Sequence, residues 1–252
     1  MNISWVLANL LLVNICSQIG CQHHKIQCTH SMRDPSIKVK FSPQFNTRLN
    51  SSPSPFDQVS HRILKRCPSL ATALLDIFQC CWSAGVVPRC WKAACIRLIG
   101  KPTSTENPDQ PSNFRPIALT ACIGKVFTAI LKNRWLKYML ANGYLDRSIQ
   151  KAFMNKTSGC IEHHAKLAAI LRDARSKHKS LAVCWLDLAN AYGSVHHSLI
   201  DFSLARYYAP PTFSGLVRSL YQGLSASFMT REWSTPSIPL KTGVSVLEIH
   251  SL

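Results

Sequence analysis

A run of apolar residues from 181 to 186 ends at a single carboxylate, Asp187. Such a run is typical of a buried strand, whose carboxyl end presents its last side chain to solvent. An Asp in that place can hold a divalent cation. An isolated Asp after a strand more often belongs to a turn or caps a helix. The run therefore predicts a strand with a carboxylate at its end, and the role of that carboxylate depends on the surrounding sequence.

The chain is strongly basic. Its 252 residues contain 29 Lys and Arg against 12 Asp and Glu, a formal net charge of +17. This excess is unusual for an enzyme of small metabolites. It favours a polyanionic partner, most simply nucleic acid, because neutralised phosphates release their counterions. A basic surface without a ligand is the alternative. Hydrophobic residues form 46% of the chain, which is enough for a sizeable core.

The cysteines indicate a reducing compartment. There are 11, an odd number, and no two of them form a C-x-x-C pair. We therefore expect free thiols in an intracellular protein, nuclear or cytoplasmic, rather than a secreted one. Residues 3 to 16 resemble the apolar part of a signal peptide, so a small secreted protein is an alternative. They lack a preceding positive stretch and are too short to span a bilayer, and we expect no membrane contact.

Helices and strands alternate irregularly along the sequence, so α+β is the expected class. The first helix begins near Pro68, and Gly85 marks its end. A capping box at Ser198 predicts a later helix, which Pro210 and Pro211 must end. The other expected helices cover residues 121–141, 160–174 and 216–220, and the other expected strands cover 91–99, 227–231 and 238–242. The last two strands are expected to pair as a hairpin. The apolar spacing of the 121–141 helix is expected to place these residues inward: Ile123, Val126, Phe127, Ile130 and Leu131.

The sequence after the apolar run carries a recognisable spacing. Asp187 is followed five residues later by Tyr192, with Ala191 just before the aromatic residue. This stretch resembles the first metal-binding motif of reverse transcriptases. Further motifs stand in the order seen in the reverse transcriptases of non-LTR (LINE-type) retrotransposons: 52–57 (SPSPFD), 98–102 (LIGKP), 113–119 (NFRPIAL), 124–125 (GK) and 150–153 (QKAF). Each motif is short, and the ordered set carries the resemblance, which covers about Ser51 to Val244.

The resemblance implies a right-hand polymerase-like fold with fingers and an incomplete palm. Residues 51–180 would form the fingers-like region, and 181–244 the partial palm with the first catalytic Asp motif. Residues 1–50 lack clear periodicity and stay a poorly defined N-terminal segment. Residues 245–252 resemble nothing in the family and are expected to be an unrelated tail.

The resemblance also assigns roles around the apolar run. Asp187 would be the first catalytic carboxylate and a ligand of Mg²⁺, with the Leu188 backbone carbonyl as a further contact. Tyr192 would exclude a ribose 2′-hydroxyl by its shape, the group that distinguishes RNA from DNA building blocks. A tyrosine of the core is the alternative for Tyr192. The implied partners are an RNA template and a DNA primer; the sequence does not indicate an oligomeric state.

A second set of residues is expected to bind nucleotide or template. Pro116 holds the preceding residue, Arg115, in an extended conformation, and an Arg fork on a stiff segment suits phosphate recognition. By resemblance Arg115 and Lys101 lie near the template or incoming nucleotide, with Gln150 and Phe153 as a wall. The cations of the 121–141 helix are equally well explained as a solvated face or, together with Arg97, Lys101 and Arg115, as part of a phosphate-binding surface: Lys125, Lys132, Arg134 and Lys137.

The chain departs from the family where the metal site would be completed. After Lys241-Thr-Gly-Val244 the family continues into a Gln-Gly motif and later an aromatic-x-Asp-Asp turn, and this sequence has neither. With Asp187 alone, Mg²⁺ would be held weakly and mostly by water. We therefore expect a reverse transcriptase fragment that does not polymerise DNA by itself. A non-catalytic basic module that binds nucleic acid is the alternative.

Overall fold

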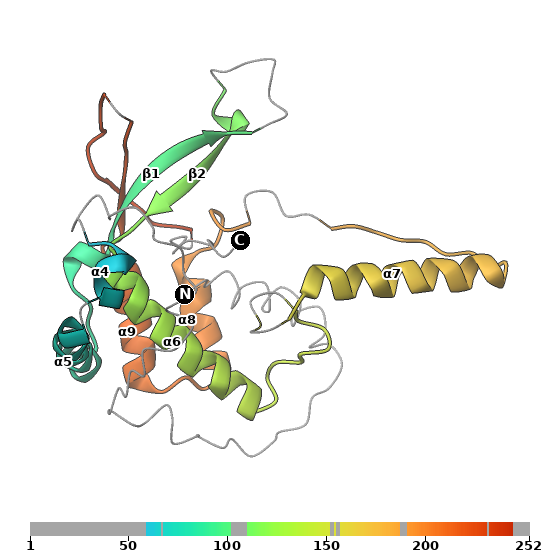
Figure 1. Ribbon diagram of the computed structural model, residues 1–252, viewed down its shortest axis with the longest axis horizontal. Helices are drawn as coiled ribbons and strands as arrows, with labels where there is room; N and C mark the ends of the chain where they lie inside the picture. The colour runs from blue at the N-terminus through green and yellow to red at the C-terminus, as the bar shows by residue number, and fades with distance from the viewer. Residues whose placement is uncertain are drawn as a thin grey trace.

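The computed structural model describes residues 59–66, 68–101, 110–151, 154, 157–186, 191–230 and 232–243. Within them, helices and strands mix as expected for the predicted class (Figure 1). The helices are α4 (His61–Arg66), α5 (Pro68–Ala84), α6 (Cys122–Ala141), α7 (Gly159–Ser176), α8 (His197–Arg206) and α9 (Pro211–Tyr221). The strands are β1 (Ala93–Gly100), β2 (Phe114–Leu119), β3 (Ser225–Phe228) and β4 (Ile238–Pro239).

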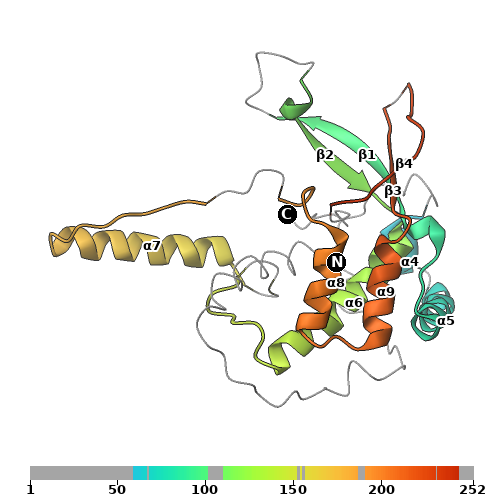
Figure 2. The ribbon, with the colours of Figure 1, turned by 180° about the vertical axis from the view of Figure 1, so that it is seen from behind.

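Helix α6 forms the centre of the core. Its predicted apolar positions Val126, Phe127 and Leu131 are at most 1% exposed. In the next turns, the Trp135 ring stacks on that of Phe213 from α9, with 5.1 Å between centroids. Burial of side chains this large contributes about 1.5–3 kcal/mol each. Figure 2 shows α8 and α9 beside α6, so the spacing that predicts this helix also predicts its buried face.

The four strands form a mixed sheet in the order β2-β1-β3-β4. Strand β1 pairs in parallel with β3 through residues 93–96 and antiparallel with β2 through 95–100. Its second half therefore leaves the sheet with β2 as a two-stranded ribbon, which projects from the helices in Figure 1. The last two strands pair antiparallel as predicted, but the bounds differ: the paired residues of β3 are Ser225 and Ala226, before the predicted start at 227, with Ala226 opposite Ile238.

Two helix boundaries differ from the prediction. The capping box at Ser198 is wrong, because α8 begins at His197 and its N-cap, His196, makes no side-chain cap hydrogen bond. His196 instead forms a β-bridge with Thr242, which fixes the chain before the helix. Helix α9 begins at Pro211, earlier than predicted, because proline fits the first turn of a helix.

The predicted strand that ends at Asp187 is wrong for residues 181–186. These residues form no regular structure and are all exposed, with Trp185 at 76% and Leu186 at 86%. A strand requires a neighbour for its backbone hydrogen bonds. None of the described strands pairs with this run. Asp187 itself lies outside the described residues.

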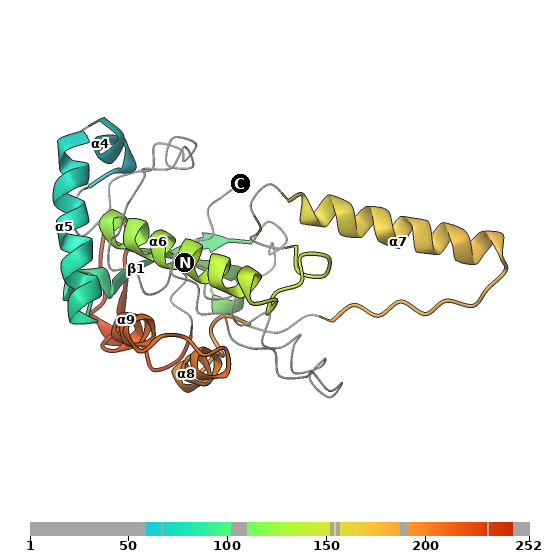
Figure 3. The same cartoon turned by 90° about the horizontal axis from the view of Figure 1, so that it is seen from below.

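Helix α7 confirms the prediction of a helix but does not join the core. None of its residues is buried, and it extends away from the other helices (Figures 1 and 3). Residues 177–186 turn at its far end and run back toward the rest of the chain. In the described part of the chain, no helix has the length and apolarity needed to cross a membrane.

Candidate nucleic-acid interface

The projecting ribbon collects cations on one of its faces. Arg97 of β1 lies opposite Ile117 of β2, and Ile99 lies opposite Arg115. Directly opposed residues share a face, and so do residues two apart on one strand. Arg97 and Arg115 are therefore diagonal neighbours, with Cα atoms roughly 7–8 Å apart. Both side chains are exposed, and Ile99 is 52% exposed between them.

Lys101 extends this face by one position. Its backbone N–H donates to the Asn113 carbonyl at 2.8 Å, which continues the ladder past Gly100. By alternation Lys101 stands on the same face as Arg97, and its side chain is exposed. Strands β1 and β2 contain no Asp or Glu. We call this face, with the exposed Arg97, Ile99, Lys101 and Arg115 and the half-buried Ile117, the ribbon face.

Proline keeps this ribbon two-stranded. β2 is an edge strand of the sheet, and Pro116 removes a backbone donor from it. Proline at an edge discourages pairing with a further strand. No described strand extends the ribbon beyond β2. Two guanidinium forks and an ammonium group beside the exposed Ile99 can bind phosphates and contact the apolar parts of a nucleotide chain.

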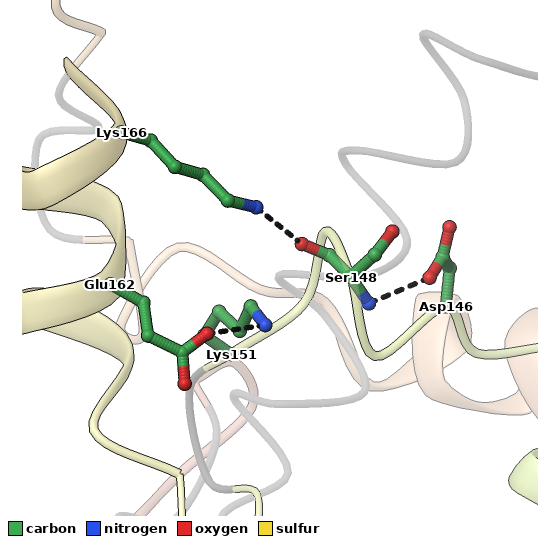
Figure 4. Close-up of polar contacts among 5 residues, drawn as sticks. All are labelled: Asp146, Ser148, Lys151, Glu162 and Lys166. Carbon is green, nitrogen blue, oxygen red and sulfur yellow. Dashed lines mark hydrogen bonds and ion pairs between the residues drawn. The ribbon is translucent and has the colours of Figure 1, made fainter. Parts of the chain in front are cut away.

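Polar contacts join the loop before α7 to the first turns of that helix (Figure 4). The Asp146 carboxylate accepts from the Ser148 N–H at 2.7 Å, and Lys166 donates to the Ser148 carbonyl at 3.4 Å. Lys151 and Glu162 form an ion pair at 2.5 Å. Hydrogen bonding to Ser148 lowers the pKa of Asp146, and hydrogen bonding to Lys151 lowers that of Glu162. We call these five residues the α7 clamp.

Gln150 lies inside this loop. Its backbone N–H donates to the Asp146 carbonyl at 2.9 Å, and the residue is only 7% exposed. The structure thus places Gln150 away from the surface, and its contact with a nucleotide stays a prediction. Phe153, the other residue of the predicted wall, lies outside the described residues.

The turn at Tyr192 packs against residues near position 243. The Gly243 N–H donates to the Val195 carbonyl at 2.8 Å, and His197 Nε2 lies 3.0 Å from the Gly243 carbonyl oxygen. Gly243 has a φ of +89°, and a Cβ there would lie 3.3 Å from the Gly193 carbonyl oxygen. Glycine is therefore needed at this approach. Apart from the glycine itself, no sequence pattern indicates this contact.

Tyr192 is 38% exposed, which contradicts the alternative of a core tyrosine. Its role beside a sugar stays a prediction, because Asp187 and Leu188 lie outside the described residues. Among the residues that the structure describes, no three His, Cys, Asp or Glu side chains gather to hold a metal ion. Mg²⁺ binding by Asp187 and the Leu188 carbonyl therefore stays a prediction.

The cations of α6 are not equivalent. The Arg134 guanidinium lies over the Trp82 ring, 4.6 Å from its centroid, and so packs against the core. Lys137 is exposed. Arg134 is therefore half-buried against Trp82, a contact that neither interpretation of these cations predicted.

No family model matches the chain. The chain is 25% identical over 236 residues to the Retrovirus-related Pol polyprotein from type-2 retrotransposable element R2DM of Drosophila melanogaster, covering 90% of this chain and 21% of that protein. It is 27% identical over 199 residues to the Probable RNA-directed DNA polymerase from transposon BS of the same species, covering 78% and 21%. For the RNA-directed DNA polymerase from mobile element jockey, also from that species, the identity is 23% over 189 residues, covering 75% and 20%. The chain spans about a fifth of the length of these relatives.

Proposed function

We propose that this chain, a reverse transcriptase domain fragment homologous to the RNA-directed DNA polymerases of non-LTR retrotransposons, binds a template–primer through the ribbon face. The homology confirms the resemblance found in the ordered motifs. The observation that carries the proposal is the set of three exposed cations on one face of a projecting ribbon without carboxylates. The net charge of +17 supports the same partner.

The motifs divide the chain into two proposed regions, a fingers-like region and a partial palm. Residues 51–180 act as fingers, with Arg97, Lys101 and Arg115 on phosphates of the RNA template or DNA primer. Residues 181–244 contribute part of the palm. There Asp187 and the Leu188 carbonyl hold Mg²⁺, and the exposed Tyr192 meets the sugar of the incoming nucleotide. The described cysteines are all free, which supports an intracellular location.

Binding can be tested by changing the ribbon face alone. We expect Arg97→Gln with Arg115→Gln to lower the slope of log affinity against log salt by about 1.4 for a single-stranded oligonucleotide, because each lost phosphate contact removes about 0.7. Fluorescence anisotropy across a salt series measures this slope. Arg62→Gln with Arg66→Gln on α4 is the matched control, since both are exposed and the same charge is removed. Equal slopes for the two variants would contradict the proposal.

We further propose that this chain does not polymerise DNA by itself. Two-metal phosphoryl transfer requires several carboxylates, and no two Asp residues are adjacent anywhere in the sequence. In primer extension on an RNA template with Mg²⁺, wild type and Asp187→Ala should give the same background. Extension by wild type above that of Asp187→Ala would show that the metal site is complete. Salt-dependent RNA binding without metal-dependent extension would favour the alternative, a non-catalytic module that keeps the basic fingers and has lost the metal chemistry.

A further inference from the structure

Helix α7 has a composition that core packing does not explain. From residue 159 to 180 the chain has five basic side chains against two acidic ones, a net charge of +3. None of the α7 residues is buried. The helix therefore contributes no core residue, although it keeps 18 residues in regular structure. Core packing therefore explains neither the net positive charge of α7 nor its exposure.

The ion pairs leave an uncompensated positive group at the far end of α7. Glu162 pairs with Lys151, which belongs to the preceding loop. Asp173 pairs with Lys177 at 2.6 Å. No described carboxylate forms an ion pair with Arg172, Arg175 or Lys179. We call the exposed cations Arg172, Arg175, Lys177 and Lys179 the α7 tip.

The geometry of the helix end holds this group together. Arg172 and Arg175 are one turn apart on neighbouring positions of the helix surface. His178 adopts a left-handed conformation with a φ of 47°, and the Lys179 N–H donates to the Ala174 carbonyl at 2.9 Å. This closes the helix in the manner of a Schellman motif and keeps Lys179 beside the last turn.

Helix stability accounts for only part of these charges. A cation in the last turn is favourable because the carboxyl end of a helix carries partial negative charge. Arg175 lies in that turn, and Lys177 caps it and pairs with Asp173. Arg172 lies further back, where this effect has faded. Its like-charged neighbour Arg175 repels it, which destabilises a free helix. A bound polyanion would relieve that repulsion.

We propose that the α7 tip is a second contact for the sugar–phosphate backbone of nucleic acid, distinct from the ribbon face. This inference rests on the proposed function and adds a surface to it. The α7 clamp fixes the first two turns of the helix against the preceding loop, so the tip is carried at the end of an anchored helix (Figures 3 and 4). Exposed Arg and Lys side chains on such an arm can follow a backbone without reading its bases.

The test uses the full chain and a fluorescent single-stranded oligouridylate across a salt series. We expect Arg172→Gln, Arg175→Gln and Lys179→Gln together to lower the salt slope by about 2 and to weaken binding more than tenfold at low salt. The matched control removes three exposed cations elsewhere, with Arg62→Gln, Arg66→Gln and Arg89→Gln, and should change the slope less. Gln is a good helix former, and circular dichroism checks that α7 persists.

The results of these assays distinguish the α7 tip proposal from the ribbon face proposal. The variant Arg172→Lys with Arg175→Lys keeps the charge and should keep the salt slope. A lower salt slope in this variant would overturn the proposal that the α7 tip contacts the backbone through its charge. If the tip variant matches its three-charge control while the ribbon variant loses binding, the tip proposal fails and the ribbon proposal stands. If the tip variant loses binding while the ribbon variant matches its own control, the ribbon proposal fails and the tip proposal stands. Equal competition by polyglutamate of the same charge would also overturn the tip as a nucleic-acid surface.

Discussion

Gly159 shows how one missing side chain positions an element. It is the first residue of α7, and a Cβ there would lie 2.5 Å from Lys151 Cβ and 3.3 Å from the Lys151 carbonyl carbon. Atoms so close to the backbone cannot move aside as the end of a flexible side chain can. The Lys151 side chain is also only 14% exposed and pairs with Glu162. Glycine therefore lets the loop and the helix approach closely enough for the α7 clamp to form.

We expect Gly159→Ala to destabilise the protein, which is opposite to the usual effect of this change in a helix. Ala normally favours a helix over Gly by about 1 kcal/mol. Gly215→Ala in α9 is the matched control, since its Cβ would meet only the Gly85 carbonyl oxygen at 3.7 Å. Urea unfolding of both variants measures the difference. If Gly159→Ala proved as stabilising as Gly215→Ala, the close approach would not constrain the loop.

At the scale of the element, α7 depends on charge where α6 depends on packing. Helix α6 is fixed by Phe127, Leu131 and Trp135 in the core. The described contacts that anchor α7 are polar, and two of its clamp carboxyls, Asp146 and Glu162, have lowered pKa values. A lowered pKa in the folded state means that the carboxylate form is the one the structure stabilises. The two helices should therefore respond differently to acid.

We expect the α7 clamp to weaken in acid. Above the ordinary carboxyl pKa of about 4 the full stabilisation is present, and it is lost as pH falls through the lower folded pKa values. As pH falls, the opening of the first α7 turns, measured by hydrogen exchange of their backbone amides, should therefore increase at a higher pH than the opening of α6. Glu162→Gln should remove much of this pH dependence, because Gln cannot lose a charge. An unchanged pH profile in Glu162→Gln would contradict a role for the Lys151 pair.

At the scale of the whole molecule, local periodicity predicts elements better than it predicts their neighbours. The apolar spacing of α6 gave both its bounds and its buried face, because core packing and spacing agree there. The same kind of spacing predicted α7 as a helix but not its exposure. Parallel pairing of β1 with β3 joins segments more than a hundred residues apart, and no local pattern specifies it.

For the ribbon face, the sequence indicates individual cations but not their arrangement. Arg115 and Lys101 were expected from the motifs, and Arg97 was visible only as a nearby cation. Their shared face follows from the β1–β2 register, which two short strands do not fix from sequence alone. The run 181–186 was mispredicted because apolar residues favour a strand whether or not a partner strand is available. The contact of Gly243 with Val195 depends on the whole packing of α8.

The exposed run from 181 to 186 has a consequence for behaviour in concentrated solution. It is uncharged, apolar and open to solvent and contains the β-favouring Val183 and Trp185, which is typical of an aggregation-prone segment. Lys177 and Lys179 shortly precede it, and charges near such a segment act as gatekeepers that keep copies apart. Ionic strength screens this repulsion, so solubility should fall as salt rises. The same basic tip would then serve to hold a polyanion and to hold identical chains away from one another.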